Sequence, residues 1–300
     1  MAQSPSRSVC VLLATHNGAR FIEEQLASLR GQDGVDVLVV ASDDHSRDAT
    51  PELLAAYAAE GGMDILPRLP QPGGSAGRNF LRLIADCPRL DCDFYAFCDQ
   101  DDVWLPHKLS HSIAMLDATR SDIYSSDVEA FWPDGRAAVI RKSQPQVRFD
   151  HMLEAAGPGC TYLLRRDVFL ALRNWVRANY AELQTVRVHD WLIYAWARLR
   201  GLRWFIDPAV TMRYRQHANN EAGANVGWRH AKRRMSQLLD GSFRRDAIKI
   251  AEVLQDESVF TQRLRRLRAR DRLALALRAG QARRKGADRW IIRLFFLFSR

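Results

Sequence analysis

The sequence predicts an α/β protein with a mostly parallel sheet flanked by helices, followed by a basic α-helical extension. Residues 9–15 form a continuous apolar run, typical of a strand buried on both faces, and the amphipathic segment 21–32 follows it. Residues 35–42 and 51–61 repeat this order of strand and helix. Two such units in tandem indicate parallel strands joined by right-handed crossovers.

The prediction of an extension rests on the distribution of charge. The net charge of +9 divides into −4 for residues 1–226, which hold 24 Lys and Arg against 28 Asp and Glu, and +13 for residues 227–300, which hold 20 against 7. Beyond residue 227 the chain is Arg-rich and shows no strand pattern. We therefore expect a globular domain over 1–226 and a basic helical extension over 227–300.

Length and composition bound the class of protein. A chain of 300 residues with 47% hydrophobic content can bury a full core. No stretch reaches the roughly 18 apolar residues that span a bilayer, and the first apolar run is too short for a signal peptide. The cysteines are odd in number and lack C-x-x-C spacing, which indicates reduced, mostly buried thiols. We therefore expect a cytoplasmic protein, free or peripheral on the inner face of the cell membrane. The cysteines are Cys10, Cys87, Cys92, Cys98 and Cys160.

The segments after the second unit continue the alternation. The Pro- and Gly-rich residues 69–74 form a loop, either near a ligand or an ordinary surface connection, and a helix over 75–85 follows. Residues 108–118 have the spacing of an amphipathic helix. Residues 121–132 alternate like a strand and end at a Pro-Asp-Gly turn.

The second half of the globular domain mixes loops, strands and helices. Residues 136–150 are polar and irregular, as in a loop. Residues 157–175 read as a Gly-rich bend, a short strand and a helix, and residues 188–201 as a helix that packs on the sheet. Residues 202–207 and 209–217 are predicted to form paired strands.

An acidic cluster interrupts the apolar residues between Tyr95 and Leu105. Asp99, Asp101 and Asp102 fall within four positions, directly after a short apolar run. Neighbouring carboxylates repel one another, so they need solvent or a cation to stay ionised. The cluster therefore fits a hard-metal or sugar-hydroxyl site, or else an Asp-rich turn that caps the next helix.

Two other polar turns favour the first of these interpretations. Residues 15–18 and 42–48 also follow predicted strands, so all three turns fall at the carboxyl edge of the sheet. Ligands of open α/β sheets bind at that edge.

Seven segments in the same order resemble the family 2 glycosyltransferases of the GT-A fold, particularly their bacterial rhamnosyltransferase-like branch. The resemblance covers about residues 8–225 and implies a nucleotide-sugar half over about 8–130 and an acceptor half over about 131–226. The segments are VCVLLATHNGARFIEEQLASL, VVASDDHSRDAT, GSAGRNFLRLI, FCDQDDVWLPHKL, GPGCTYLLRRD, VHDWLIY and YRQHANN.

The resemblance implies a role for each matching residue. It makes Asp190 the catalytic base and places His189 and Trp191 at the acceptor. It places Asp101 and His217 on a divalent metal, Mg²⁺ or Mn²⁺. From the residues alone, Asp190 also fits a helix cap and His217 a surface loop. The positions implied to bind the nucleotide-sugar are Thr15, Asn17, Asp43, Asp44, Arg78, Asp99 and Gln100.

One position in the first of these loops departs from the family's pattern. The family more often has Tyr or Phe at the place of His16. The remaining positions of that loop, Thr15 and Asn17, match.

The implied reaction is a single displacement with inversion at the sugar carbon. The donor is dTDP-β-L-rhamnose or a UDP-sugar, and the acceptor is a growing surface polysaccharide such as an O-antigen, or a lipid-linked glycan. Trp191 and Trp196 offer aromatic faces on which a sugar could stack.

Two other classes compete with this interpretation. A sugar-phosphate nucleotidyltransferase shares such a sheet, but its Gly-rich signature is missing from residues 9–20. A non-enzymatic scaffold would use the basic extension to bind RNA or an acidic membrane. The sequence does not give the oligomeric state.

The extension itself ends in a strongly apolar run that follows clusters of arginine. It is too short to cross a bilayer but suits the membrane interface, where arginines meet anionic headgroups. The alternatives are a helical hairpin packed on the globular domain and a dimer contact. Nucleic acid is a poorer fit, because a phosphate-binding surface has no need of the apolar run. Its apolar residues are Trp290, Ile291, Ile292, Leu294, Phe295, Phe296, Leu297 and Phe298.

Overall fold

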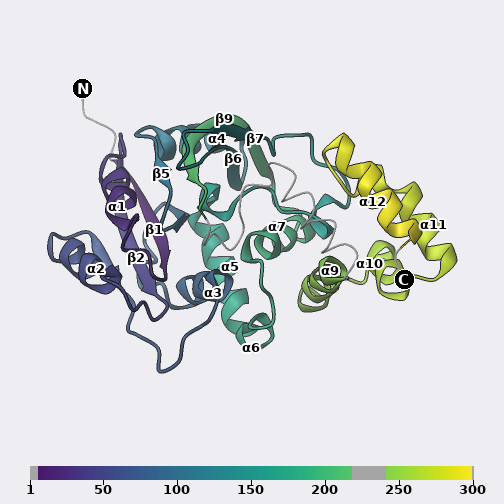
Figure 1. The fold of residues 1–300 in the computed structure, drawn as a ribbon, viewed down its shortest axis with the longest axis horizontal. Coiled ribbons are helices and arrows are strands. Elements are labelled where there is room, and N and C mark those ends of the chain that lie inside the picture. The colour runs from purple at the N-terminus through teal and green to yellow at the C-terminus, as the bar shows by residue number, and fades with distance from the viewer. Residues whose placement is uncertain (1–5, 218–240, 299–300) are drawn as a thin grey trace.

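The computed structural model describes residues 6–217 and 241–298, which form a curled sheet with helices on both faces and a helical extension at one end (Figure 1). Within these residues the strand order is β3-β2-β1-β4-β8-β6-β9-β5, with β7 paired to β6. The predicted α/β class is confirmed. The strands are β1 (Arg7–Thr15), β2 (Val35–Asp43), β3 (Met63–Ile65), β4 (Phe94–Asp99), β5 (Val103–Trp104), β6 (Ile123–Phe131), β7 (Ala137–Ile140), β8 (Leu163–Arg165) and β9 (Trp204–Arg215).

The first four strands in the sheet order are parallel, as predicted. β1 pairs with β2 and β4, and β2 pairs with β3. The register aligns Thr15 with Asp43 and Ala14 with Asp99, so the turns after β1, β2 and β4 meet at one edge. The helices that follow these strands are α1 (Ile22–Arg30), α2 (Thr50–Ala59), α3 (Ala76–Asp86) and α4 (Lys108–Thr119).

The remainder of the sheet is mixed. β8 is antiparallel to β4 and β6, whereas β9 is parallel to β6 and antiparallel to β5. The prediction of paired strands over 202–217 is wrong, because this segment forms the single strand β9. The register with β6 jumps from Ser126–Asp207 to Asp127–Val210, so Pro208 is accommodated in a bulge and the chain does not reverse there.

The sheet has an apolar core on each face. Alternate residues of β1 point to opposite sides, with Cys10 and Leu12 in one buried cluster and Val9 and Val11 in the other. This explains why the strand reads as an uninterrupted apolar run. One core holds α3, α5 (Arg166–Ala178) and α7 (His189–Leu199), and the other holds α1, α2 and α4.

The extension packs against the first of these cores. Phe243, Ile250, Phe260 and Phe296 join the apolar cluster that contains the residues of α7, which is the packed arrangement considered from the sequence. None of the described helices is both long and apolar enough to cross a membrane. The helices of the extension are α9 (Ser242–Val253), α10 (Val259–Arg266), α11 (Ala269–Leu277) and α12 (Gly286–Phe298), with a 3₁₀ turn, η3 (Ala279–Gln281).

Candidate active site

The acidic cluster lies where β4 ends. Asp99 is the last residue of β4, and Asp101 and Asp102 lie in the turn that leads to β5. Nε2 of His217 lies 2.6 Å from Oδ2 of Asp101, although the two residues are far apart in sequence. The imidazole of His217 also stacks on Phe21, with ring centroids 4.9 Å apart. The structure therefore brings together the two residues implied to bind metal.

The donor atoms of Asp101 and His217 suit a divalent cation. A carboxylate oxygen and an imidazole nitrogen in adjacent positions on Mg²⁺ or Mn²⁺ lie about 3 Å apart, since each bond is about 2.1 Å. The 2.6 Å separation reaches that value with a small side-chain movement. Both side chains keep some exposure to solvent, which leaves room for the phosphate oxygens and waters that complete the shell of such ions.

Asp102 has a different environment from Asp101. Its side chain is fully buried, and its Oδ1 accepts a hydrogen bond from the backbone N–H of Arg215. Burial, followed by repulsion from Asp101 and Asp99, raises the pKa of Asp102 well above its usual range. Asp102, Asp99 and the buried Cys160 also cluster within 4.8 Å of one another. We infer that Asp102 has a structural role, because its hydrogen bond to Arg215 holds β9 against the turn after β4.

The loop after β1 is held by Gln100. Its Oε1 accepts from the backbone N–H of His16 at 2.8 Å and its Nε2 donates to the His16 carbonyl at 2.9 Å. Asn17 adopts a left-handed backbone conformation, and its Oδ1 accepts from the N–H of Arg47. A Cβ on Gly18 would come within 2.2 Å of Gln100. The resemblance implies that Gln100 and Asn17 bind the nucleotide-sugar. In the structure they hold the conformation of the loop after β1.

The aspartates after β2 also organise neighbouring backbone. Asp44 accepts hydrogen bonds from the N–H groups of Gly73 and Gly74 at 2.6 and 2.8 Å, which anchors the predicted Pro- and Gly-rich loop to the sheet. Asp43 accepts from the hydroxyl of Thr15 at 3.0 Å. Residues of the loops after β1 and β2 and of the Pro- and Gly-rich loop therefore lie together at one edge of the site.

A pocket opens beside Asp43 and Asp44. Arg78 crosses it, with Nε donating to the Gln184 carbonyl and Nη1 to the Gly73 carbonyl. Asn79 donates to the carbonyls of Thr15 and Ser42, which holds the ends of β1 and β2 together. Sequence reasoning gave no site role to Asn79 or to three further pocket residues, because α6 (Tyr180–Leu183) lies far along the chain and Arg82 looks like an ordinary helix residue. These lining residues are Arg82, Tyr180 and Gln184.

His189 and Asp190 begin helix α7. The imidazole of His189 stacks on Phe80 with centroids 4.2 Å apart. Burial lowers the pKa of His189, against an opposing contribution from Asp190, so the ring is neutral at neutral pH. Asp190 accepts from the N–H of its neighbour Trp191 at 2.7 Å. The N-cap position belongs to Val188, so the alternative that Asp190 caps the helix is wrong.

The 3₁₀ turn η2 (Gly159–Thr161) connects this helix with the acidic cluster. A Cβ on Gly159 would lie 2.6 Å from Nε2 of His189 and 3.5 Å from the Cβ of Asp190. The next residue, Cys160, belongs to the cluster with Asp99 and Asp102. Asp190 and the acidic cluster thus lie against consecutive residues of one turn.

Trp191 and Trp196 are buried, which corrects the expectation that they stack on a sugar. Trp191 is 7% exposed, donates from Nε1 to the His151 carbonyl and stacks on Phe243 of the extension at 5.5 Å. Trp196 is 1% exposed. Trp191 therefore packs against the extension, whereas the ring of Trp196 lies 6.3 Å from that of Trp175 on α5, so neither indole offers an open face to a sugar.

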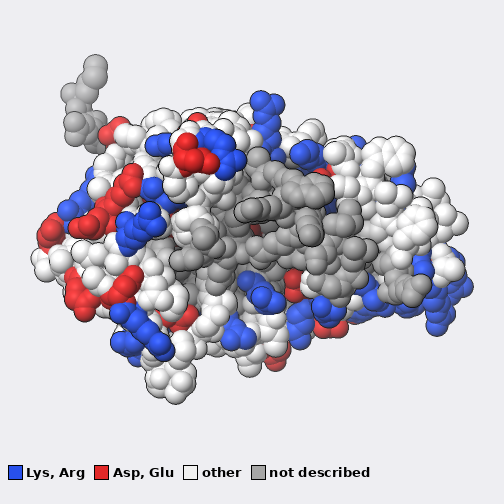
Figure 2. Space-filling view, viewed as in Figure 1, with Lys and Arg blue, Asp and Glu red and all other residues white. Residues whose placement is uncertain are grey.

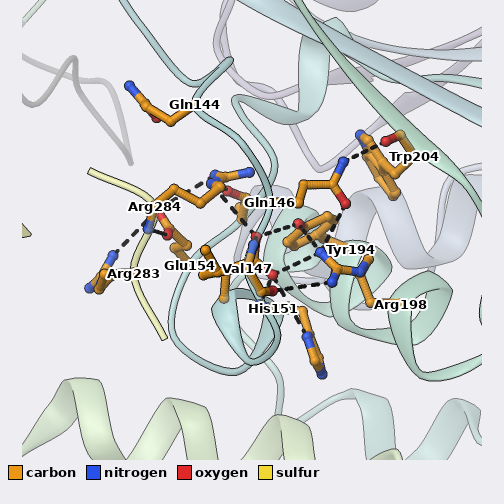
Figure 3. Close-up of polar contacts among 12 residues, drawn as sticks. Gln144, Gln146, Val147, His151, Glu154, Tyr194, Arg198, Trp204, Arg283 and Arg284 are labelled. Atoms are coloured by element: carbon orange, nitrogen blue, oxygen red, sulfur yellow. Dashed lines mark hydrogen bonds and ion pairs between the residues drawn. The ribbon is translucent and has the colours of Figure 1, made fainter. Parts of the chain in front are cut away.

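A buried ionic cluster joins Tyr194 and Arg198 of α7 to Arg284 of the extension (Figure 3). Asp150 accepts from Nη1 of Arg198 at 2.8 Å and from the hydroxyl of Tyr194 at 2.9 Å, both on α7. From the extension, the backbone N–H of Arg284 donates to Glu154 at 2.7 Å, and Nε of Arg284 lies 3.9 Å from Asp150. The cluster therefore ties the helix that carries Asp190 to the extension.

The charge state of Asp150 follows from this environment. Burial opposes ionisation, but hydrogen bonding by His151 and the charges of Arg198 and Arg284 outweigh it and lower the pKa of Asp150. Asp150 is consequently a buried anion. Arg284 supplies part of the positive charge that compensates it.

The fold of the chain is the GT-A fold. Carboxylates at the ends of parallel strands, beside a second, mixed half of the same sheet, are the arrangement of the GT-A glycosyltransferases. Among solved structures, residues 1–349 of TarS of S. aureus in complex with UDP match with a TM-score of 0.59 at 16% identity, over 96% of this chain and 80% of that one. The mannosyltransferase PcManGT of Pyrobaculum calidifontis, in complex with GDP-Man and Mn²⁺, matches with a TM-score of 0.51 at 15% identity, over 96% and 84%.

Sequence comparisons narrow the class to a family. The profile of glycosyl transferase family 2 matches residues 10–168. The dTDP-rhamnosyl transferase RfbG of Shigella flexneri is 38% identical over 96% of this chain and 99% of its own length. The succinoglycan biosynthesis protein ExoO of Rhizobium meliloti is 33% identical over 67% of this chain and 59% of its own. The chain belongs to glycosyl transferase family 2 and is a rhamnosyltransferase-like member. The alternative hypotheses of a non-enzymatic scaffold and of a nucleotidyltransferase are therefore rejected.

Proposed function

We propose that the enzyme transfers L-rhamnose from dTDP-β-L-rhamnose to a glycan, with inversion at the anomeric carbon. The observation that carries this proposal is the turn η2, which lies against Asp190 on one side and joins the acidic cluster on the other. The choice of donor is supported by the full-length similarity to a dTDP-rhamnosyl transferase. We further propose an acceptor that is a growing surface polysaccharide, such as an O-antigen, or a lipid-linked glycan at the cytoplasmic face of the membrane.

The donor side of the site would hold the nucleotide at the carboxyl edge of the sheet. The pocket beside Asp43, Asp44 and Arg78 combines acceptors for the base with a cation for the phosphates. Asp99, at the end of β4, would bind the ribose or the sugar. Asp101 and His217 would hold Mg²⁺ or Mn²⁺, which stabilises the charge of the departing diphosphate.

The base side of the site would activate the acceptor. Asp190 takes the proton of the acceptor hydroxyl as that oxygen attacks the anomeric carbon from the face opposite the diphosphate. His189 is neutral and packed on Phe80, so it serves to position the start of α7 beside the acceptor. Attack from the opposite face turns a β-linked donor into an α-linked product.

Calorimetric titration with dTDP and with UDP, each with and without Mn²⁺, tests the donor assignment. We expect metal-dependent binding of dTDP by the native chain and its loss in Asp101→Ala. Preference for UDP would replace the rhamnose donor with a UDP-sugar. Absence of binding to either nucleotide by folded protein would refute the proposed site. With dTDP-rhamnose and a saccharide acceptor, NMR of the product should show an α linkage.

A further inference from the structure

The two last helices of the extension expose an apolar face. α11 and α12 pack against each other, and Nε of Arg293 donates to the Ala276 carbonyl between them. Their inner sides are buried, at Leu275 and Phe296 for example. Their outer sides carry large apolar residues, of which Leu277 is 74%, Trp290 64% and Phe298 76% exposed. We call this surface the hairpin face; its residues are Leu273, Leu277, Trp290, Leu294, Leu297 and Phe298.

The spacing of these residues makes the hairpin face continuous along each helix. Leu273 and Leu277 are four residues apart on α11, and Trp290, Leu294 and Phe298 repeat the same interval on α12. Residues four apart lie on one side of a helix. Clustered exposure of large apolar side chains is rare on a protein surface that faces only water.

Positively charged residues flank the hairpin face along the chain. Arg270 and Arg278 lie exposed at the two ends of α11, and Lys285 is exposed just before α12. The guanidinium of Arg293 lies 4.5 Å from the centre of the Trp290 ring. Residues 241–300 hold 16 Lys and Arg against 6 Asp and Glu. Figure 2 shows positive side chains prevailing over negative ones at the end of the molecule that Figure 1 assigns to the extension.

This combination of charge and apolar surface selects among the possible partners. In a symmetric dimer the same surface meets itself, which would bring the arginines of two copies together. Nucleic acid would satisfy the charge but would leave Leu277, Leu294 and Phe298 in water. An anionic bilayer satisfies both, because its headgroups attract the cations and its acyl boundary takes up the apolar side chains.

We propose that the hairpin face binds the surface of an anionic lipid bilayer. Trp290, Leu294 and Phe298 of α12, with Leu273 and Leu277 of α11, enter the boundary between headgroups and acyl chains. The surrounding Arg and Lys side chains contact lipid phosphates. This inference goes beyond the proposed transfer reaction and does not depend on the identity of the donor.

Flotation of the full-length protein with lipid vesicles tests this inference. We expect the protein to float with phosphatidylcholine vesicles that contain phosphatidylglycerol, and much less with phosphatidylcholine alone or at high salt, because salt screens the charges. The triple change Leu277→Ser, Trp290→Ser and Leu294→Ser should lower the partition coefficient about tenfold or more, since three exposed apolar side chains no longer enter the lipid.

A control comes from the globular domain. Val139 on β7 is also an exposed apolar residue, at 49%, but it lies outside the extension, so Val139→Ser should leave flotation unchanged. Circular dichroism and nucleotide titration of each variant verify that the fold is intact. If no variant binds nucleotide but flotation behaves as expected, the proposed donor site is refuted and the membrane proposal stands.

Three results would overturn the membrane proposal. One is failure of folded native protein to float with anionic vesicles. Another is flotation that the triple variant retains in full. The third is a dimer, seen by sedimentation in the absence of lipid, that the triple variant dissociates, because the hairpin face would then be a contact between two copies.

Discussion

The donor side and the base side of the proposed site are held in place by different means. On the donor side, short loops at adjacent strand ends bind one another, as Gln100 binds His16 and Asp44 binds Gly73. On the base side, α7 is held by buried charges that include Arg284 of the extension. Contacts within the globular domain hold the donor residues, whereas the helix that carries the base is also tied to a segment near the end of the chain.

The largest expected effect is on the base side. Asp190→Asn should lower the transfer rate by about 10²- to 10⁴-fold, because the amide cannot take the proton of the acceptor hydroxyl. Affinity for dTDP in the presence of Mn²⁺ should stay unchanged. Steady-state kinetics and calorimetry on the same preparation measure both. Retention of full transfer activity would remove Asp190 from the mechanism.

A change on the donor side should have the opposite signature. Asp101→Asn weakens the metal site and should lower the transfer rate by about a thousandfold, together with metal-dependent nucleotide affinity. Asp101 is bonded to Arg215 of β9 and to His217, so hydrogen exchange of the α7 amides should stay the same. Loss of transfer with unchanged nucleotide binding would contradict the assignment of Asp101 to the donor side.

The next effect tests whether the extension supports the base side. Arg284→Met leaves Asp150 and Glu154 with one buried cation fewer and should lower the free energy of unfolding by about 3 kcal/mol. Urea unfolding measures this difference. Arg278→Met is a matched control at an exposed position and should change stability by less than about 0.5 kcal/mol.

Arg284→Met also tests whether the two sides of the site are independent. If the extension supports only the base side, Arg284→Met should lower the transfer rate and the exchange protection of α7 while nucleotide affinity is kept. Equal losses of nucleotide affinity and transfer rate would show that the two sides are not independent.

The smallest effect concerns pH. The pKa of Asp150 is lower in the folded protein than in the unfolded chain, so its contribution to stability is complete above the unfolded value and is lost as the pH falls through the folded value. The free energy of unfolding should therefore decline on acidification. In Asp150→Asn this part of the decline should be missing. Urea unfolding at several pH values measures this. The prediction is contradicted if the free energy of unfolding falls equally with pH in the native protein and in Asp150→Asn.

Local motifs made the donor side predictable from the sequence. The strand of residues 9–15, the turns after it and the acidic cluster are contiguous in sequence, and the parallel order of strands brings them to one edge. The pairing of Asp101 with His217 followed only from the family resemblance. The spacing of residues in the sequence does not indicate this pair, because His217 follows β9, which lies in the other half of the sheet.

The base side was less predictable because its contacts are not local. Trp191 looked like a sugar-stacking residue, since nothing near it in sequence shows that Phe243 covers its ring. Arg284 looked like one more cation of a basic tail, yet its side chain is buried against Asp150 and Glu154. The strand β9 was misread as two because a bulge at Pro208 resembles a turn in sequence.

The stacking of Phe243 on Trp191 has a consequence for how the protein unfolds. A single apolar cluster runs from α3 and α7 through Phe243 to Phe296, with no break between the globular domain and the extension. The region that defines the family by sequence is therefore smaller than the cooperative folding unit. Heat should melt both parts in one calorimetric transition, and a chain cut after residue 226 should expose the rings of α7 and aggregate.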